Sequence, residues 1–119
     1  MSESIVRQKA EDFSVKTYRL NQRLRLANEF VLANQILKSG TSICANLYEA
    51  KFAHSTADYI SKLTISLKEA SETCFWLNLL HRVELIDGSY YKELHQDTHE
   101  IISILVAIIK RLKQIESTQ

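Results

Sequence analysis

Apolar and small residues recur along most of this chain at alternating steps of three and four positions, with polar residues between them. That spacing lines one face of an α-helix. It predicts four helices, over residues 4–26, 29–53, 56–85 and 89–115. The expected inner stripes are Val6, Ala10, Phe13, Thr17, Leu20 and Leu24; Phe30, Ala33, Leu37, Gly40, Cys44 and Leu47; Ile60, Leu63, Leu67, Ala70, Cys74 and Leu77; and Leu94, Thr98, Ile101, Leu105, Ile108, Leu112 and Ile115.

Three short breaks separate the predicted helices. We expect Asn28 to cap the second helix, and Ser55 with Asp58 three residues later resembles a capping box. Asp87–Gly88 is the clearest turn signal. The 119 residues include no proline and only two glycines, so the chain has few places to turn. The predicted fold is a single all-α domain, residues 1–119, folded as an up-down-up-down antiparallel four-helix bundle.

The glycine at position 40 falls in the middle of the second predicted helix. A glycine there costs up to about 1 kcal/mol against alanine, so we interpret Gly40 as a helix-packing residue at a close backbone approach, where leucine would cost far more than alanine. Asn46 and Glu49 flank the same stripe. We expect Asn46 to bond across the bundle and Glu49 to pair with Lys62 or Lys51; a ligand site is the alternative.

The third and fourth predicted helices carry more apolar residues than one core stripe requires. A second set falls on their outer flanks, at Ile65, Trp76, Leu79, Val83, Tyr91, Ile102, Val106 and Ile109. In a monomer these residues would form an exposed apolar surface larger than the roughly few hundred Å² that soluble monomers usually show. They therefore predict a homo-oligomer interface. Phe75 and Trp76 could alternatively stack on nucleic-acid bases.

The charge balance excludes a strongly basic, nucleic-acid-coating protein, because the formal net charge is only +1. A modest basic patch is expected where the first helix begins and the fourth ends. Its predicted nucleic-acid contacts are Arg7, Lys9, Lys51, Lys110, Arg111 and Lys113. At the opposite end, the basic second half of the first helix should be offset by Glu84, Asp87, Glu93, Asp97 and Glu100.

The sequence contains no recognisable catalytic constellation. His95 and His99 lie four positions apart, but the Glu-x-x-His pairs of di-iron bundles are missing. Ser39, Thr41 and Ser42 have no histidine near them in the expected register, and Cys44 and Cys74 are expected to be free, buried thiols. We therefore predict no enzyme activity, no cofactor and no metal site.

The N-terminal residues are polar and mixed in charge, and the longest apolar run, Ile101–Ile109, is about half of what a membrane span needs. A cytoplasmic protein with no membrane partner is the expectation.

Two segments resemble a known family. They are QILKSGTSICANLYEA at residues 35–50 and ADYISKLTISLKEASETCFWLNLL at residues 57–80. Both are similar to the bacterial four-helix-bundle proteins encoded within intervening sequences of 23S ribosomal RNA genes. The family pattern is a basic residue, Ser-Gly-Thr-Ser-Ile, a small residue, Ala-Asn and then Glu-Ala. It is matched here by Lys38, Ser39, Gly40, Thr41, Ser42, Ile43, Cys44, Ala45, Asn46, Glu49 and Ala50.

Two positions depart from the family pattern. Lys38 stands where arginine is common, which weakens any argument for bidentate phosphate recognition there. Cys44 stands where glycine or proline is common.

The resemblance implies a closed bundle, often assembled as a homo-pentameric ring. A distant relative with that assembly, the accessory protein of diversity-generating retroelements, binds nucleic acid and a reverse transcriptase.

Two functional hypotheses follow from the sequence. The first is a non-enzymatic, homo-oligomeric adaptor that contacts RNA or DNA weakly, with itself, nucleic acid and a protein such as a reverse transcriptase as partners. The alternative is a purely protein-binding scaffold without a nucleic-acid role.

Overall fold

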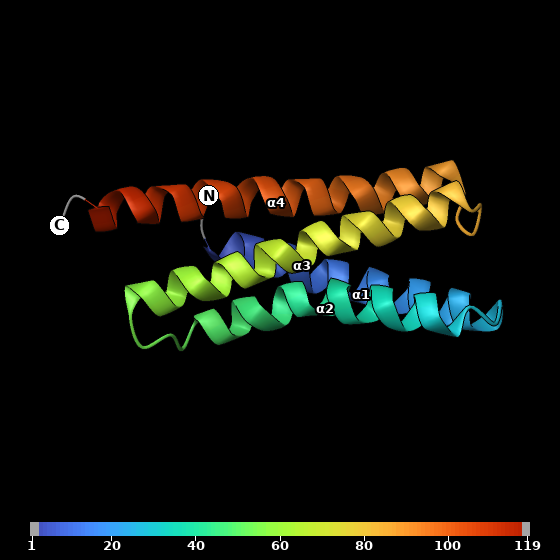
Figure 1. The fold of residues 1–119 in the computed structure, drawn as a ribbon, viewed down its shortest axis with the longest axis horizontal. Helices are drawn as coiled ribbons and strands as arrows, with labels where there is room; N and C mark the ends of the chain where they lie inside the picture. Colours follow the sequence, from blue (N-terminus) through green and yellow to red (C-terminus); the bar gives the residue numbers. More distant parts are fainter. Residues whose placement is uncertain (1–2, 118–119) are drawn as a thin grey trace.

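The computed structural model describes residues 3–117, and this part of the chain forms four α-helices (Figure 1). They are α1 (Glu3–Leu26), α2 (Phe30–Ala50), α3 (Thr56–Arg82) and α4 (Gly88–Ser117). Consecutive helices run antiparallel and pack on each other, and α1 also packs on α4, which closes the bundle. The diagonal pairs α1–α3 and α2–α4 do not pack within residues 3–117. The predicted all-α four-helix bundle is confirmed.

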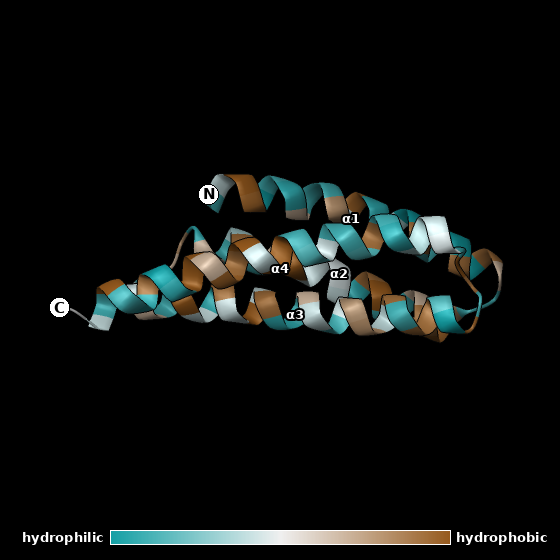
Figure 2. Ribbon diagram, turned by 90° about the horizontal axis from the view of Figure 1, so that it is seen from above, coloured by the Kyte–Doolittle hydropathy of each residue, from teal (hydrophilic) through white to brown (hydrophobic). Residues whose placement is uncertain are grey.

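The molecule is elongated, with principal extents of 52 × 23 × 19 Å. The last turns of α4 extend past the start of α1 (Figure 1). Apolar positions recur between hydrophilic ones along each helix, and α1 separates from α4 toward its N-terminal end (Figure 2). In the described part of the chain, no helix combines the length and the apolar character needed to cross a membrane.

Two helices end three residues earlier than the apolar pattern predicts. The helix α2 ends at Ala50 rather than at residue 53, because the chain tightens there into bonds three residues apart, from Lys51, Phe52 and Ala53 to the carbonyls of Tyr48, Glu49 and Ala50. The helix α3 ends at Arg82 rather than at residue 85. In both cases apolar residues that belong to the turn continue the helical spacing beyond the helix.

Two of the three turns between helices, α1–α2 and α3–α4, pass through a residue with a left-handed backbone. Asn28 has φ 62° and Glu84 has φ 63°. In each turn the following residue donates its N–H to a carbonyl five positions back, Glu29 to Leu24 and Leu85 to Leu80, both at 2.9 Å. This is the Schellman arrangement that ends a helix. The prediction that Asn28 caps the second helix is therefore wrong: Asn28 terminates α1, and asparagine tolerates this conformation well.

The starts of α3 and α4 are capped by side chains. The Asp58 N–H donates to Ser55 Oγ at 3.0 Å, which confirms the predicted cap. The Asp58 carboxylate accepts instead from the N–H of His54, one residue before the cap, at 3.3 Å. At the next turn, the Tyr90 N–H donates to Asp87 Oδ1 at 2.7 Å, so Asp87 caps α4 and Gly88 is its first residue.

The core differs from the predicted stripes mainly on α3 and α4. On α3, Ser66, Thr73 and Leu80 are buried, whereas Leu67 and Cys74 are only partly so. On α4, Ile104 and Ile109 are buried. Leu112 is partly buried and Ile115 is exposed, because the end of α4 extends beyond α1. Ile109 was predicted to lie on the outer flank, and with 8% of its surface exposed that prediction is wrong.

Buried polar groups connect neighbouring helices at specific points. Asn21 Nδ2 on α1 donates to the Ala33 carbonyl on α2 at 2.8 Å. Ser66 Oγ on α3 donates to the Ile43 carbonyl on α2 at 2.8 Å. The hydroxyls of Thr73 and Ser39 lie 3.0 Å apart. Because buried polar groups are costly without a partner, these bonds fix the register of α1 and α3 on α2.

The closest helix approach lies at Gly40. A Cβ placed on Gly40 would lie 2.5 Å from Thr17 Cγ2 and 2.7 Å from Thr17 Oγ1. Thr17 cannot easily turn aside, because its hydroxyl donates to the Phe13 carbonyl at 2.8 Å and the residue is buried. Gly40 is therefore a packing residue, as its sequence position indicates, and even alanine there would force a shift.

We expect Gly40→Ala to lower the free energy of unfolding by about 1–3 kcal/mol, the usual cost of adding a methylene to a packed core. The loss should shrink when Thr17→Ala is already present, because the two atoms closest to the added Cβ, Thr17 Cγ2 and Oγ1, are then gone. Gly88→Ala is the control, since its nearest neighbour, His81 Nε2, is 3.9 Å away. Urea denaturation followed by circular dichroism measures all four variants. Equal stability of Gly40→Ala and Gly88→Ala would contradict the close approach.

Candidate interaction surfaces

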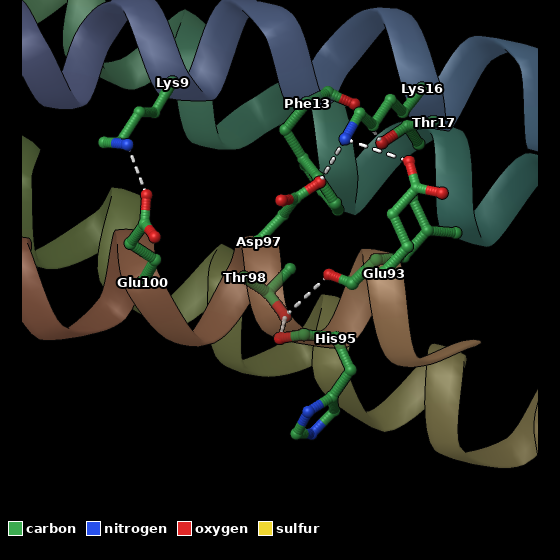
Figure 3. Close-up of polar contacts among 10 residues, drawn as sticks. Lys9, Phe13, Lys16, Thr17, Glu93, His95, Asp97, Thr98 and Glu100 are labelled. Carbon is green, nitrogen blue, oxygen red and sulfur yellow. Dashed lines mark hydrogen bonds and ion pairs between the residues drawn. The ribbon is translucent and has the colours of Figure 1, made fainter. Parts of the chain in front are cut away.

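The seam between α1 and α4 is bridged by charged side chains (Figure 3). Lys16 Nζ lies 2.7 Å from Asp97 Oδ2 and 3.0 Å from Glu93 Oε2, so one ammonium joins two carboxylates. About two turns back along α1, Lys9 pairs with Glu100. The expected charge offset between the first and fourth helices is confirmed at Lys16.

A small cleft of about 150 Å³ opens on this seam, lined by Lys9, Asp12, Phe13, Lys16, Asp97, Glu100 and Ile101. The Asp97 carboxylate raises the pKa of Lys16, while partial burial opposes the rise and Glu93 adds to it. A lysine with a raised pKa stabilises the fold fully below its ordinary value of 10.5 and loses that contribution as pH rises through the raised value. Lys16 is therefore protonated at neutral pH and carries the charge that the ion pair needs.

The basic patch is divided by its ion pairs. Lys9 is engaged with Glu100, and Arg111 Nη2 lies 3.8 Å from Glu3 Oε1. Lys51, Lys110 and Lys113 have no carboxylate within 4 Å among residues 3–117, nor does Arg7. Lys110 and Lys113 belong to the extended end of α4. The cations without a carboxylate partner are therefore the two lysines at the α4 end of the patch, together with Arg7 and with Lys51, whose Nζ lies 5.7 Å from the centroid of the Tyr48 ring.

The predicted helix-packing residues beside Gly40 behave differently from each other. Lys62 Nζ donates to Glu49 Oε1 at 3.1 Å, which confirms the Glu49 pairing. Asn46 does not bond across the bundle as predicted. Its Nδ2 donates to the Ser42 carbonyl of its own helix at 2.8 Å. Asn21, which carries no such signal in the sequence, makes the buried cross-helix bond instead.

The outer surface of α3 and α4 exposes most of the predicted interface residues. Val83 is 51% exposed, and Ile65 and Val106 are also exposed. Trp76, Leu79, Tyr91 and Ile102 are partly buried. Phe75 meets Trp76 edge-to-face at 4.9 Å between ring centroids, and Trp76 Nε1 donates to Glu72 Oε2 at 3.0 Å. Seven of the eight predicted interface residues thus reach the surface, and Ile109 does not.

The remaining polar candidates are engaged locally. The His95 ring is tilted against the Tyr91 ring, with 5.2 Å between their centroids, and the His81 ring stacks on the Tyr91 ring at 4.4 Å. His99 is exposed. Thr41 and Ser42 donate to the carbonyls of Leu37 and Lys38.

Cys44 is buried and Cys74 is partly buried beside Thr98, and both are free thiols. Burial raises the pKa of the Cys44 thiol, which keeps it protonated.

The sequence analysis missed an exposed apolar tip at the α1–α2 turn. Leu26 is 87% exposed and Val31 is 72% exposed, and the Phe30 ring lies 5.2 Å beneath the Arg25 guanidinium. Phe30 was assigned to the inner stripe, and the structure corrects that assignment because α2 begins at this residue. The exposed turn at residues 26–29 could not be recognised in the sequence, because the helical spacing of apolar residues continues through it almost without interruption.

We expect Lys16→Gln to lower the free energy of unfolding by about 0.5–1 kcal/mol, the range of a partly exposed ion pair. The loss should diminish as salt is raised, and should vanish when Asp97 and Glu93 are already neutralised to Asn and Gln. Lys92→Gln is the control, since Lys92 has no carboxylate within 4 Å in the described part of the chain. A loss independent of the two carboxylates would exclude the ion pair as its cause.

A known protein family and a solved structure are similar to this chain. The sequence profile of the 23S rRNA-intervening sequence proteins matches residues 2–107. A crystal structure from Bacteroides thetaiotaomicron VPI-5482, described as a protein with unknown function from the S23 ribosomal protein family, shares 46% sequence identity and superimposes with a TM-score of 0.90. The alignment covers 92% of this chain and 99% of that one. No curated protein matches. The chain belongs to the 23S rRNA-intervening sequence protein family.

Proposed function

We propose that this protein is a non-enzymatic adaptor that assembles from copies of itself and contacts nucleic acid weakly, through charge. The observation that carries the proposal is the apolar outer surface of α3 and α4, where Ile65, Phe75, Val83 and Val106 are all exposed. An apolar surface that the fold itself leaves uncovered is a site for another protein surface. A second copy is the simplest occupant, because it is always present.

Several features support a role without catalysis. Among residues 3–117 there is no group of three or more His, Cys, Asp or Glu side chains that could hold a metal ion. The hydroxyls of Thr41 and Ser42 are bonded to helix carbonyls, and the Cys44 thiol is buried. The cleft between α1 and α4 has charged groups, but Lys9 and Lys16 already pair there with carboxylates. The two lysines of the cleft are therefore already engaged and are not free to act on a substrate.

We expect light scattering behind size-exclusion chromatography to give a particle several times the mass of one 13.7 kDa chain. The physical reason is burial of the outer α3–α4 surface between subunits. Val106→Glu should reduce the mass, because a charge would then be buried in the contact. A ring of five is the number implied by the resemblance. A single-chain particle at micromolar concentration would overturn the assembly.

The proposed nucleic-acid contact rests on the cations at the end of α4 and on the family name. The family is named for ribosomal RNA genes, and the Bacteroides thetaiotaomicron relative is assigned to a ribosomal protein family. In this chain Lys110 and Lys113 have no carboxylate within 4 Å in the described residues. A ring of copies would repeat this pair in each subunit. Repetition would give a weak single contact a larger combined affinity.

We expect labelled RNA and DNA to bind with an affinity that falls as salt rises, by a slope of about −0.9 per neutralised phosphate on duplex DNA. Lys110→Glu with Lys113→Glu should abolish binding. Lys38→Glu with Lys92→Glu is the control, because it changes net charge equally at exposed lysines elsewhere. Equal weakening by both pairs would mean that only net charge matters and would remove this patch.

The alternative function is a protein-binding scaffold without a nucleic-acid role. The ion pairs Lys9–Glu100 and Arg111–Glu3 favour it, because they neutralise two of the six cations of the basic patch. A reverse transcriptase is the protein partner implied by the resemblance. The salt titration separates the two functions, since a scaffold would bind neither RNA nor DNA at low salt.

A further inference from the structure

The turn between α2 and α3 presents an aromatic ring to solvent. Phe52 is 82% exposed, which makes it the most exposed Phe, Tyr or Trp side chain among residues 3–117. Its backbone is held by the tight turn, because the Phe52 N–H donates to the Glu49 carbonyl at 3.0 Å between two similar bonds from Lys51 and Ala53. The ring is therefore fixed in position without being covered by the fold.

A hollow of about 410 Å³ connects this turn with the end of α4. Lys51 and Ala53, on either side of Phe52 in the sequence, line it together with Leu112 of α4. Leu112 is followed directly by Lys113. The α2–α3 turn and the last turns of α4 also lie at the same end of the bundle (Figure 1). Phe52 therefore lies beside the cations on which the proposed nucleic-acid contact rests.

The charged groups at this end of the bundle differ in whether they have partners. The engaged carboxylates are Glu3 with Arg111, Glu11 with the Tyr48 hydroxyl, Glu49 with Lys62, and Asp58 with His54. The cations without a carboxylate within 4 Å in the described residues are Arg7, Lys51, Lys110 and Lys113. On the last turns of α4, Glu116 also has no ion-pair partner within 4 Å among these residues. The available charge at this end is thus mainly positive, which fits a ligand that carries several negative charges.

An exposed ring among available cations suits an unpaired nucleotide better than a duplex. Lysines attract the phosphates of either form, and charge alone favours duplex DNA, whose salt dependence per phosphate is the steeper. The bases of a duplex are already stacked on each other and paired. Only in a single strand is the face of a base free to stack on an aromatic side chain.

We infer that this end of the molecule binds unpaired nucleotides of a single nucleic-acid strand, with one base stacked on the Phe52 ring and the flanking phosphates against Lys51 and Lys113. The inference rests on the proposed nucleic-acid contact and names the form of nucleic acid that the contact takes. It also adds an aromatic residue to a site that the charges alone define only as basic.

The first test is the affinity of the full-length protein for labelled oligouridine, measured by fluorescence anisotropy beside the duplex of oligouridine with oligoadenosine. Phe52→Ala should weaken binding of the single strand by about five-fold to a hundred-fold, the usual effect of losing one stacked base. Binding of the duplex should not change. Labelled oligothymidine, tested in parallel, distinguishes RNA from DNA as the source of the unpaired strand.

The matched control is Tyr18→Ala, which removes a ring that is 53% exposed on α1. It should bind both nucleic acids like the parent. Phe52 and Tyr18 are both exposed, so neither change should unfold the chain, which circular dichroism verifies.

The second test reports stacking directly. The single native tryptophan, Trp76, is first changed to phenylalanine, and Phe52→Trp is then added. Oligouridine should quench the fluorescence of this variant, because a base stacked on an indole ring quenches it, and the affinity should remain at least that of the parent. Tyr18→Trp in the same background should keep its fluorescence when the strand binds.

The outcomes separate this inference from the proposed function. No binding of either nucleic acid at low salt would overturn the nucleic-acid contact and the stacking with it. Binding that Lys110→Glu with Lys113→Glu abolishes, but that Phe52→Ala leaves unchanged for the single strand, would overturn the stacking alone. Equal quenching of the Phe52→Trp and Tyr18→Trp variants would also overturn the stacking on Phe52.

Discussion

The close approach of α1 and α2 at Thr17 and Gly40 is the constraint on which the bundle depends. Only a residue without a side chain fits opposite Thr17, since a Cβ on Gly40 would lie 2.5 Å from its Cγ2. On the neighbouring face of α2, the Ser39 hydroxyl meets Thr73 of α3 at 3.0 Å. The Ser39–Gly40 pair therefore fixes α1 on one side and α3 on the other, so α2 positions two helices that do not touch each other.

The α1–α4 seam has a different character because no turn joins these two helices. Lys16, Asp97 and Glu93 bridge it, and partly exposed ion pairs of this kind each contribute little to stability. The bundle is thus held closed chiefly from the α2 side, where α1 is placed by packing and by the buried Asn21 bond to Ala33. The ion pairs set the register of α1 on α4, two helices that packing elsewhere in the bundle has already brought together. This arrangement explains why α1 can separate from α4 toward its start (Figure 2).

Sequence patterns predicted what depends on local geometry. The four helices, the packing role of Gly40, the Ser55 cap and the Glu49–Lys62 pair all follow from spacing and residue type. The errors arise where two local solutions compete. Asn46 can bond the Ser42 carbonyl of its own turn, and does so instead of crossing the bundle. Ile109 belongs to a stripe that drifts around α4, because 3.6 residues per turn do not repeat every seven positions.

The surfaces were harder to predict because the turns determine them. Helical spacing continues through residues 26–31, so the sequence assigns Phe30 to the core. The left-handed backbone of Asn28 ends α1 there and leaves Leu26 and Val31 projecting from the end of the bundle. Glu84 turns the chain from α3 into α4 in the same way, and α3 ends at Arg82. Glycine is the usual residue at such positions. Two non-glycine residues with the same backbone therefore end α1 and α3 at one end of the molecule, and the exposed apolar tip beside Asn28 is a property of the turn and not of either helix alone.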